Sequence, residues 1–249
     1  MPKDKKKAAK ASKKDSPVHV LLVEDEESFI EALTVGLARE GFEVSVARDG
    51  AEALEMFEES EPDLILLDLM LPKMSGLDVC RTIRNTSDVP VIMVTAKGEE
   101  IDTVVALEVG ADDYVTKPYR MRELVARMRA VLRRTPSEEK KKTGIDHENA
   151  PTDLGNIRLE PSTRRAYVRG DEVHLRRKEF ELLQILMENA GRVLTRDVLI
   201  DRVWGSDYVG DTKTLDVHIK RLRSQVEEDP KTPTLITTIR GVGYRFDGN

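Results

Sequence analysis

The sequence predicts two domains: a doubly wound, five-stranded parallel α/β domain followed by a winged helix-turn-helix domain. The chain of 249 residues is too long for one ordinary domain core, and its length fits two domains of roughly 100 to 130 residues each. Between residues 18 and 134, short apolar runs alternate five times with longer amphipathic stretches, which is the pattern of βα units. After residue 150, short alternating strands, helical stretches and a closing hairpin replace this alternation.

The strands expected in the first domain are its apolar runs, of which the first, third and fourth are nearly continuous, as in strands buried on both faces. These runs are Val18–Val23, Glu43–Ala47, Asp63–Leu67, Pro90–Val94 and Tyr114–Thr116. Between them, helices are expected near 27–40, 50–60, 76–86, 99–109 and 120–134, and Gly41 and Gly110 follow two of the expected ends. A parallel sheet with helices on both faces follows from this order.

The second domain is expected to open with short strands, continue with three helices and close with a hairpin. The strands are expected at Ile157–Leu159, Arg165–Arg169 and Val173–Leu175, the helices near 178–189, 196–204 and 212–227, and the hairpin over about 235–246. Gly241 and Gly243 lie where that hairpin bends. This order is that of a helix-turn-helix carrying a wing.

A linker joins the two domains, and the distribution of charge distinguishes them. Residues 1–17 form a basic, low-complexity arm that we expect to be disordered, and the charged, aperiodic residues 135–150 are typical of a linker. The net charge of -6 conceals a strongly acidic first domain, residues 18–134, with 24 acidic and 13 basic side chains. Residues 151–249 are nearly neutral, with 17 basic and 16 acidic side chains, so any affinity for nucleic acid has to come from local clusters of cations.

The composition also argues against several classes of protein. No apolar run approaches the roughly 20 residues that span a bilayer, and no apolar segment follows the basic start, so we expect a cytoplasmic protein without a signal peptide. The single cysteine, Cys80, cannot form an internal disulfide and is expected to be buried, and the four scattered histidines lack zinc-ligand spacing.

Five polar residues lie at the carboxyl ends of the expected strands of the first domain: Glu24, Asp25, Asp68, Thr95 and Lys117. Ligands of open α/β sheets bind at this edge. Three carboxylates at close range repel one another unless a hard cation neutralises them, so a Mg²⁺ site is expected, completed by the backbone carbonyl of Met70.

With the cation and Lys117 in place, Asp68 is expected to be a nucleophile that accepts a phosphoryl group, and the Thr95 hydroxyl is expected to bind one of its oxygens. The structural alternative is that Asp68 ends a strand and only pairs with Lys117. Five such groups at four separate strand ends favour the functional interpretation.

The helix expected over 212–227 has an apolar face and an outward stripe of mixed character. The apolar face is Leu215, Ile219, Leu222 and Val226, and the stripe is Lys213, Val217, Lys220 and Ser224, flanked by Arg221 and Arg223. Such a stripe is typical of helices that read the DNA major groove, although a solvated basic helix is the alternative for an isolated segment. The hairpin that follows is expected to offer Thr238, Arg240 and Tyr244 to a groove or to phosphates.

Four segments, VLLVEDEE, PDLILLDLMLPKMSGLDVC, PVIMVTAK and GADDYVTKP, resemble the receiver signatures of OmpR/PhoB-family two-component response regulators. The resemblance covers residues 18–247 and is strongest to the actinobacterial phosphate-starvation regulators of that family. It implies a CheY-like, flavodoxin-like receiver domain over 18–134 and a winged-helix DNA-binding domain over 151–249. It also implies phosphotransfer from a sensor histidine kinase to Asp68, and a coupled shift of Thr95 and Tyr114 as the switch.

The resemblance also implies partner surfaces. It implies a homodimer face with Asp113 and Arg127, and Glu108 and Arg129, as exposed pairs. Contacts to double-stranded promoter DNA are implied for Lys213, Thr214, Val217, His218, Lys220, Arg221 and Arg223. For His218, a structural role is an equal alternative because its helical angle lies nearer the packed face. Residues 205–211 correspond to the loop that contacts RNA polymerase, and Trp204 is expected in the core.

Two rival functions remain to be weighed. A haloacid-dehalogenase-like phosphatase also uses an aspartate nucleophile, but it needs a second aspartate two residues later, where this chain has Met70. A constitutive DNA-binding protein with an inert dimerisation module would have a defective pocket, whereas the residues of this pocket are all present. We therefore expect a regulator, not an enzyme, in which phosphorylation favours a dimer that binds adjacent half-sites.

Overall fold

The computed structural model describes residues 17–96, 100–133, 150–206, 208, 210 and 212–248, and it leaves out the side chains of residues 96 and 100–104. Residues 1–16 of the expected arm and residues 135–149 of the expected linker lie outside the described residues. Among the described helices, none is both long and apolar enough to cross a membrane.

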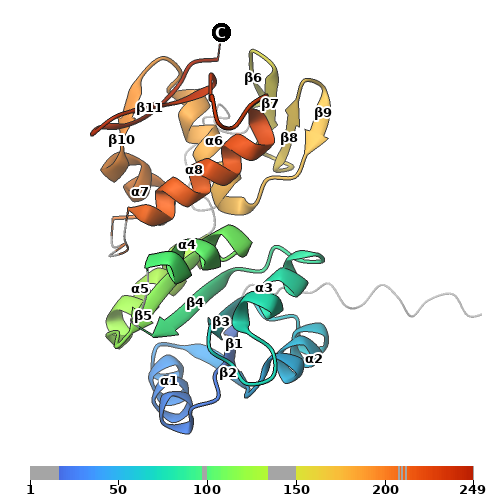
Figure 1. Ribbon diagram of the computed structural model, residues 1–249, viewed down its shortest axis with the longest axis vertical. Helices are drawn as coiled ribbons and strands as arrows, with labels where there is room; N and C mark the ends of the chain where they lie inside the picture. The colour runs from blue at the N-terminus through green and yellow to red at the C-terminus, as the bar shows by residue number, and fades with distance from the viewer. Residues whose placement is uncertain are drawn as a thin grey trace, which may run out of the picture.

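The first domain is built on a parallel five-stranded sheet with strand order β2-β1-β3-β4-β5 (Figure 1). The strands are β1 (Val18–Val23), β2 (Phe42–Ala47), β3 (Leu64–Asp68), β4 (Val91–Ala96) and β5 (Asp113–Lys117). This order reverses direction between β1 and β3, which confirms the doubly wound sheet expected from the sequence.

Helices cover both faces of this sheet. They are α1 (Glu27–Arg39), α2 (Gly50–Ser60), α3 (Gly76–Arg84), α4 (Glu100–Val109) and α5 (Met121–Leu132). Along β1, Val20 and Leu22 pack with α1 and α5, whereas Leu21 and Val23 pack with α2, α3 and α4. Successive side chains of a strand point to opposite faces, so a strand covered on both faces is apolar throughout. Cys80 is fully buried in the second of these layers, as expected.

The second domain begins with an antiparallel four-stranded sheet and continues with three helices and a three-stranded sheet. The elements are β6 (Thr152–Leu154), β7 (Ile157–Glu160), β8 (Arg165–Val168), β9 (Asp171–Val173), α6 (Arg177–Glu188), β10 (Val193–Thr195), α7 (Arg196–Trp204), α8 (Lys213–Val226), β11 (Ile236–Ile239) and β12 (Gly243–Phe246). This is the expected helix-turn-helix with a wing.

Three details of this domain differ from the expectation. Strands β6 and β10 were not predicted, because three residues are too few to display a period of two. Strand β9 begins earlier than expected, because Arg169 and Gly170 have φ of 55° and 91° and turn the chain within two residues.

The core of the second domain is the one expected. Leu215, Ile219, Leu222 and Val226 of α8 are buried together with Trp204, which is 0 % exposed. Gly243 allows β12 to lie against β10, since a Cβ there would meet the carbonyl oxygen of Leu194 at 2.0 Å.

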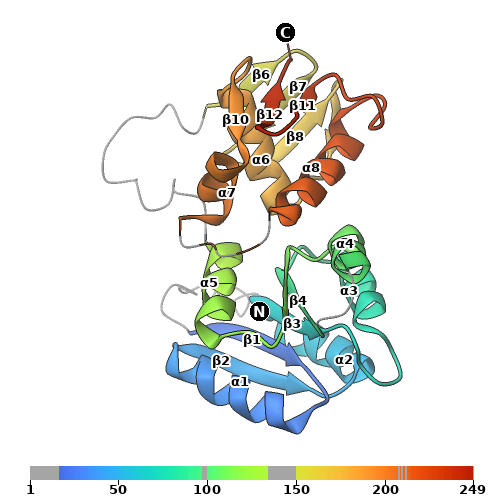
Figure 2. The same cartoon turned by 60° about the vertical axis from the view of Figure 1, so that its left-hand side comes forward.

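The two domains are in contact through α8 of the second domain and α4 of the first, which lie on either side of the boundary between the domains (Figures 1 and 2). One residue of each domain packs in the apolar cluster of the other domain. Val217 of α8 packs in the cluster of the first domain, and Ala130 of α5 packs in the cluster of the second. The helix predicted to read DNA therefore faces the first domain.

Candidate functional site

The three acids predicted from strand ends meet at one edge of the parallel sheet. Glu24 follows β1 and Asp68 ends β3, and these strands pair in register at Val23 and Leu67. Oxygens of Glu24, Asp25 and Asp68 all lie within 4.8 Å of one another. Glu24 and Asp68 are buried, whereas Asp25 is exposed. The cluster therefore opens to solvent at one side, where a small ion can enter.

Lys117, at the end of β5, joins two of these acids. Its Nζ lies 2.5 Å from Oδ2 of Asp68 and 2.7 Å from Oε2 of Glu24, and 4.1 Å from the centre of the Phe29 ring. Burial disfavours the charged ammonium, but the two acids raise the pKa of Lys117 above its usual value. Burial raises the pKa of Glu24, which Lys117 only partly offsets. A fixed positive charge thus stands beside Asp68.

The loop after β3 holds the Asp68 carboxylate from its other side. The backbone N–H of Met70 donates to Oδ1 of Asp68 at 2.9 Å. Gly76 makes this loop possible, because a Cβ there would meet the carbonyl oxygen of Asp68 at 2.1 Å. The Met70 side chain is 72 % exposed at the rim of a pocket lined by Glu24, Asp25, Glu26, Glu27, Phe29, Asp68, Met70 and Lys117.

The donor set of this pocket fits a hard divalent cation. Five carboxylates line it, three of which lie within 4.8 Å of one another, and its lining residues include no cysteine or histidine. Such oxygen-rich sites are those that Mg²⁺ and Ca²⁺ prefer. A cation would also relieve the repulsion between Glu24 and Asp68, since one ammonium cannot neutralise three acids.

The two residues expected to act as a switch are inside the domain. Thr95 is 5 % exposed on β4 and lies opposite Thr116 of β5, and Tyr114 is 8 % exposed on β5 opposite Met93. The Tyr114 ring packs in the same apolar cluster as Val217 of α8. The predicted switch tyrosine is therefore adjacent to the contact between the domains.

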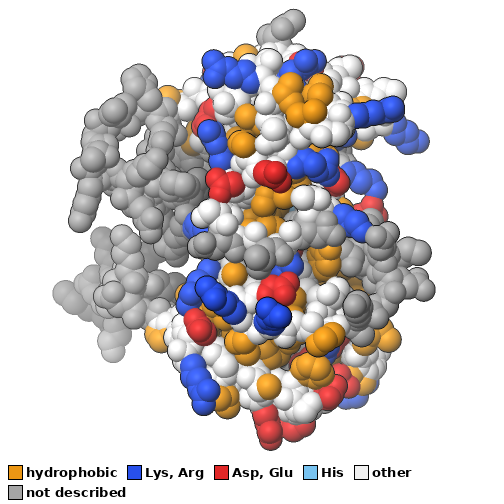
Figure 3. All heavy atoms as spheres, turned by 90° about the vertical axis from the view of Figure 1, so that its left-hand side faces the viewer, with side chains coloured by type: hydrophobic (Ala, Val, Ile, Leu, Met, Phe, Trp, Pro, Cys, Tyr) orange, Lys and Arg blue, Asp and Glu red, His pale blue; other side chains and the backbone are white. Residues whose placement is uncertain are grey.

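The residues predicted to contact DNA do not lie on an open surface of α8. Thr214, Val217 and His218 are at most 6 % exposed. Lys220 pairs with Glu108 of α4, and Arg221 donates to the carbonyl oxygens of Leu107 and Ala111, the latter at 3.2 Å. Arg223 instead binds its own domain, through the carbonyl oxygen of Ile236 and Oγ1 of Thr238. Lys213 is half-buried. On the face shown in Figure 3, basic and acidic side chains are interspersed and no continuous basic area appears.

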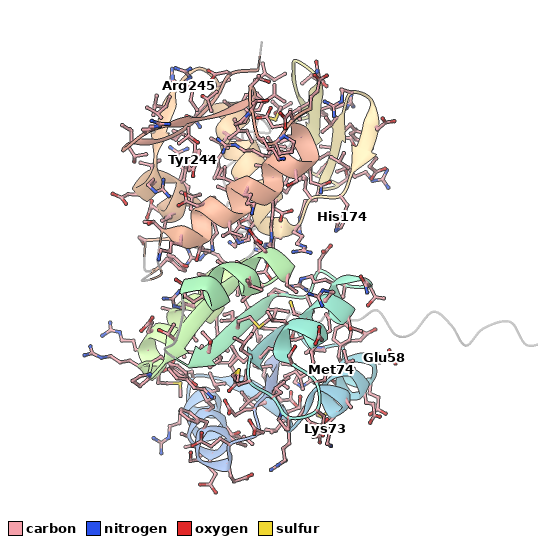
Figure 4. The ribbon with its side chains drawn as sticks, in the orientation of Figure 1. Glu58, Lys73, Met74, His174, Tyr244 and Arg245 are labelled. Carbon is pink, nitrogen blue, oxygen red and sulfur yellow. The ribbon has the colours of Figure 1, made fainter. Side chains whose placement is uncertain are left out.

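Of the three wing residues predicted to contact a groove or phosphates, two are exposed and one is buried. Thr238 and Arg240 are exposed, as expected. Tyr244 is only 4 % exposed, and its hydroxyl donates to Oδ1 of Asp216 at 2.5 Å, so its expected groove-facing position is wrong for this structure. The reason is register: Tyr244 lies between Thr238 and Leu194 in the sheet and points back at α8 (Figure 4).

Only part of the predicted dimer face has the expected exposure: Glu108 and Arg129 are exposed, whereas Asp113 and Arg127 are buried. Asp113 is 0 % and Arg127 is 5 % exposed, and they form a buried pair at 3.1 Å. Arg129 pairs with Glu40 at 2.8 Å, and Glu108 pairs with Lys220, so Glu108 and Arg129 do not pair with each other within the described chain. Asp113 and Arg127 are covered because Tyr208 and Thr214 of the second domain contact them.

One residue of this region was missed by the sequence analysis. Tyr208 lies between α7 and α8, and its hydroxyl donates to Oδ1 of Asp113 at 2.9 Å, across the domains. A loop residue in an aperiodic segment carries no signal of a contact 95 positions away, and only the fold brings the two together.

Comparison with known proteins agrees with both halves of the molecule. Residues 20–129 match the family described as response regulator receiver domain, and residues 170–246 match the family described as transcriptional regulatory protein, C terminal. The chain is similar to the sensory transduction protein RegX3 of Mycolicibacterium smegmatis, 56 % identical over 234 residues that cover 92 % of this chain and 99 % of that protein.

Two further relatives extend this likeness. The alkaline phosphatase synthesis transcriptional regulatory protein PhoP of Bacillus subtilis is 46 % identical over 233 residues, covering 92 % of this chain and 96 % of that protein. The solved structure of a RitR mutant superimposes with a TM-score of 0.68 at 27 % identity, covering 93 % of this chain and 99 % of that one. With a receiver fold, an acid pocket at its sheet edge and a winged helix-turn-helix, the chain belongs to the OmpR/PhoB family of two-component response regulators, which are transcription regulators.

Proposed function

We propose that a sensor histidine kinase phosphorylates this regulator on Asp68 and that the phosphorylated protein binds promoter DNA through α8 and the wing. The observation that carries the first half is the contact of Lys117 with both Asp68 and Glu24 inside a three-carboxylate pocket. A strand-ending aspartate that only paired with lysine would need neither Asp25 nor the open side of the pocket.

The chemistry is the transfer of a phosphoryl group between two nucleophiles. The P–N bond to the kinase histidine breaks while a P–O bond to a carboxylate oxygen of Asp68 forms, so no water is consumed. A Mg²⁺ ion held by Glu24, Asp25, Asp68 and the Met70 carbonyl would neutralise charge on the phosphoryl oxygens. Lys117 supplies a second cation beside the acceptor, and the Thr95 hydroxyl is the group that we assign to bind a phosphoryl oxygen.

The test is phosphorylation by acetyl phosphate and Mg²⁺, followed by the mobility shift of the phosphoprotein on a phosphate-binding gel. Wild-type protein and the control Glu58→Gln, an exposed acid of the same domain, should both shift. Asp68→Ala should show no shift, because Asp68 is the acid that we assign to accept the phosphoryl group and the other acid that pairs with Lys117, Glu24, is only 1 % exposed. A shift that persists in Asp68→Ala would contradict the assignment.

The geometry does not favour the phosphatase alternative. The position two residues after Asp68 holds Met70, whose thioether cannot transfer a proton, and its side chain points to solvent. A phosphorylated Asp68 would therefore persist as a signal and would not turn over rapidly.

For the DNA-binding half, we assign the major-groove contacts to α8, through Lys213, Thr214, Val217, His218, Lys220, Arg221 and Arg223, and the wing contacts to Thr238 and Arg240. Lys220→Ala and Arg240→Ala should each weaken DNA binding while leaving phosphorylation unchanged. Each lost phosphate contact should also reduce the slope of log affinity against log salt by about 0.9. Arg158→Ala, on the sheet at the other side of the domain, is the matched control. Equal slopes in all four proteins would contradict these contacts.

We further propose that the phosphorylated chain pairs with a second copy through α4, β5 and α5, with Glu108, Asp113, Arg127 and Arg129 at the contact. The loop between α7 and α8 would then be free to meet RNA polymerase. The family membership supports both assignments.

A further inference from the structure

The carboxylate of Glu227, at the end of α8, binds the first residues of the wing strand β11. We propose that Glu227 is a positioning residue for DNA binding, which fixes the wing against α8 so that Thr238 and Arg240 meet the same DNA as the helix. Glu227 itself contacts no DNA in this assignment and acts only through β11. The inference rests on the proposed DNA contacts and adds the residue that places the wing relative to the helix.

Glu227 is only 5 % exposed, and its partners are backbone N–H groups of the chain that enters β11. The N–H groups of Thr234 and Leu235 donate to Oε2 at 2.9 and 3.1 Å. Those of Leu235 and Ile236 donate to Oε1 at 3.0 and 2.8 Å. Three successive N–H groups thus converge on one carboxylate. A buried carboxylate needs such donors, so this acid specifies where the chain at 234–236 lies.

Glu227 binds an outer edge of the wing sheet. Among the described strands, β11 is at the end of the order β10-β12-β11. Its first residue, Ile236, meets α8 through both backbone groups: its N–H donates to Glu227, and its carbonyl oxygen accepts from Nη2 of Arg223 at 2.6 Å. An edge strand presents N–H and C=O groups of this kind to any neighbour. Two side chains of the helix therefore take the place of a further strand.

These two contacts also fix the register of β11 along α8. Arg223 and Glu227 are four residues apart, so they lie on the same face of the helix. Successive residues of a strand point their N–H and C=O groups to opposite sides. A shift of β11 by one residue would therefore break both contacts with Ile236. The pair thus fixes the positions of Thr238 and Arg240, which follow on the same hairpin.

The other strand of the hairpin is attached nearer the beginning of α8. The Tyr244 hydroxyl of β12 donates to Oδ1 of Asp216 at 2.5 Å. The Tyr244 ring centre lies 5.7 Å from the guanidinium carbon of Arg223. Asp216 and Glu227 are about three helical turns apart. Two attachments at this separation prevent the hairpin from pivoting on α8, and the Glu227 attachment controls the strand that leads to Arg240.

Glu227→Gln is the smallest change that tests this role. An amide keeps the shape of the side chain, but it offers one acceptor oxygen and one group with two donors. Whichever way it turns, the amide brings its N–H₂ group against the N–H of Thr234 or that of Ile236. The beginning of β11 should therefore move away from the helix. Glu228→Gln is the matched control, because it removes the same charge from an exposed neighbour.

Coupling to Arg240 distinguishes positioning from a general loss of stability. Binding of the phosphorylated proteins to a promoter fragment selected with phosphorylated wild type is measured by fluorescence anisotropy. Arg240→Ala should weaken binding about tenfold in wild type but less than about threefold in Glu227→Gln, because the displaced wing has already lost that contact. Lys220→Ala, on the helix, should cost the same in both backgrounds. Equal losses from Arg240→Ala in the two backgrounds would overturn the proposal.

The salt dependence of binding gives a second readout. Glu227→Gln should reduce the slope of log affinity against log salt by about 0.9, the value for one phosphate contact, as Arg240→Ala does. Glu228→Gln should keep the slope of wild type. An unchanged slope in Glu227→Gln would mean that the wing still reaches the DNA, and Glu227 would then have no positioning role.

Urea unfolding followed by the fluorescence of Trp204 checks that each variant is folded in the binding assay. If Glu227→Gln is unfolded, Glu227→Asp replaces it, since aspartate keeps both acceptor oxygens on a shorter side chain. This variant should couple to Arg240 in the same direction, and independent losses would count against the proposal. If neither Lys220→Ala nor Arg240→Ala weakens binding while Glu227 is intact, the proposed DNA contacts are wrong, and this inference with them.

Discussion

His218 shows how strongly the contact between the domains changes the chemistry of a single residue. Its ring is 0 % exposed, 5.4 Å from the ring of Trp204, and its Nε2 meets a carbonyl oxygen of the other domain. Burial, with the charges of Arg221 and Lys178, lowers the pKa of His218 from 6.5 to about 3, although Asp112 opposes this shift. The histidine is therefore neutral in the folded protein at any physiological pH.

This pKa predicts how stability depends on pH. Between pH 6.5 and about 3, the unfolded chain binds a proton at His218 that the folded protein excludes, so the free energy of unfolding falls as the pH falls. The contribution of His218 to this fall is up to about 1.4 kcal/mol per pH unit. Urea unfolding at pH 7 and pH 5.5, followed by fluorescence of the single tryptophan, Trp204, measures it.

The control for this prediction is His218→Gln, which has no titratable group but keeps a donor for the carbonyl oxygen of Asp112. Its stability should fall less than that of wild type over the same pH range. The same pH dependence in both proteins would mean that His218 is not held neutral by burial.

At the scale of elements, two helices of the second domain, α6 and α7, begin where their first turns are capped. The Thr195 side chain accepts a hydrogen bond from the N–H of Val198 at 3.3 Å and caps α7. Before α6, where Arg176 offers no capping oxygen, the Glu179 carboxylate reaches back to the N–H of Arg176 at 2.9 Å. Caps of this kind fix where α7 lies relative to β10, and hence where the loop that holds Tyr208 starts.

The cap of α7 gives a stability prediction. Thr195→Ala should destabilise the second domain by about 1 kcal/mol, because the N–H of Val198 loses its acceptor. Thr195→Ser keeps the hydroxyl and should recover most of this loss. Urea unfolding followed by Trp204 fluorescence compares the three proteins, and equal midpoints for the alanine and serine variants would exclude a role of the cap.

At the scale of the whole molecule, we expect phosphorylation to act through two separable steps, separation of the two domains and pairing of two copies. Separation would uncover α8, which lies against the receiver in this structure, and should raise affinity for a DNA with one half-site. Pairing links two DNA-binding domains and should raise affinity further only where a second half-site is adjacent, because the second binding event becomes intramolecular.

These steps can be separated by measuring affinity with and without acetyl phosphate on two matched DNAs, one with two half-sites and one with the second scrambled. We expect a gain of about tenfold on the single site and a further gain of at least about tenfold on the paired site. A gain only on the paired site would show that pairing alone is switched. Asp68→Ala should show no gain on either DNA.

The sequence by itself determined the two folds and the pocket, because both depend on patterns local to the chain. Continuous apolar runs require a sheet buried on both faces, and polar residues that end parallel strands must share one edge, so Glu24, Asp25, Asp68 and Lys117 meet as expected. The apolar face of α8 followed from its period in the same way.

Only the tertiary structure decided what covers the opposite face of α8. A sequence pattern shows that a residue such as Val217 can be buried or can read DNA, but not which surface it meets, because that depends on contacts between positions about a hundred residues apart. Tyr208 carries no signal along the chain that would place it against Asp113 and Arg127. Their contact exists because the packing of two separate cores brings a loop, a strand and a helix to one buried point.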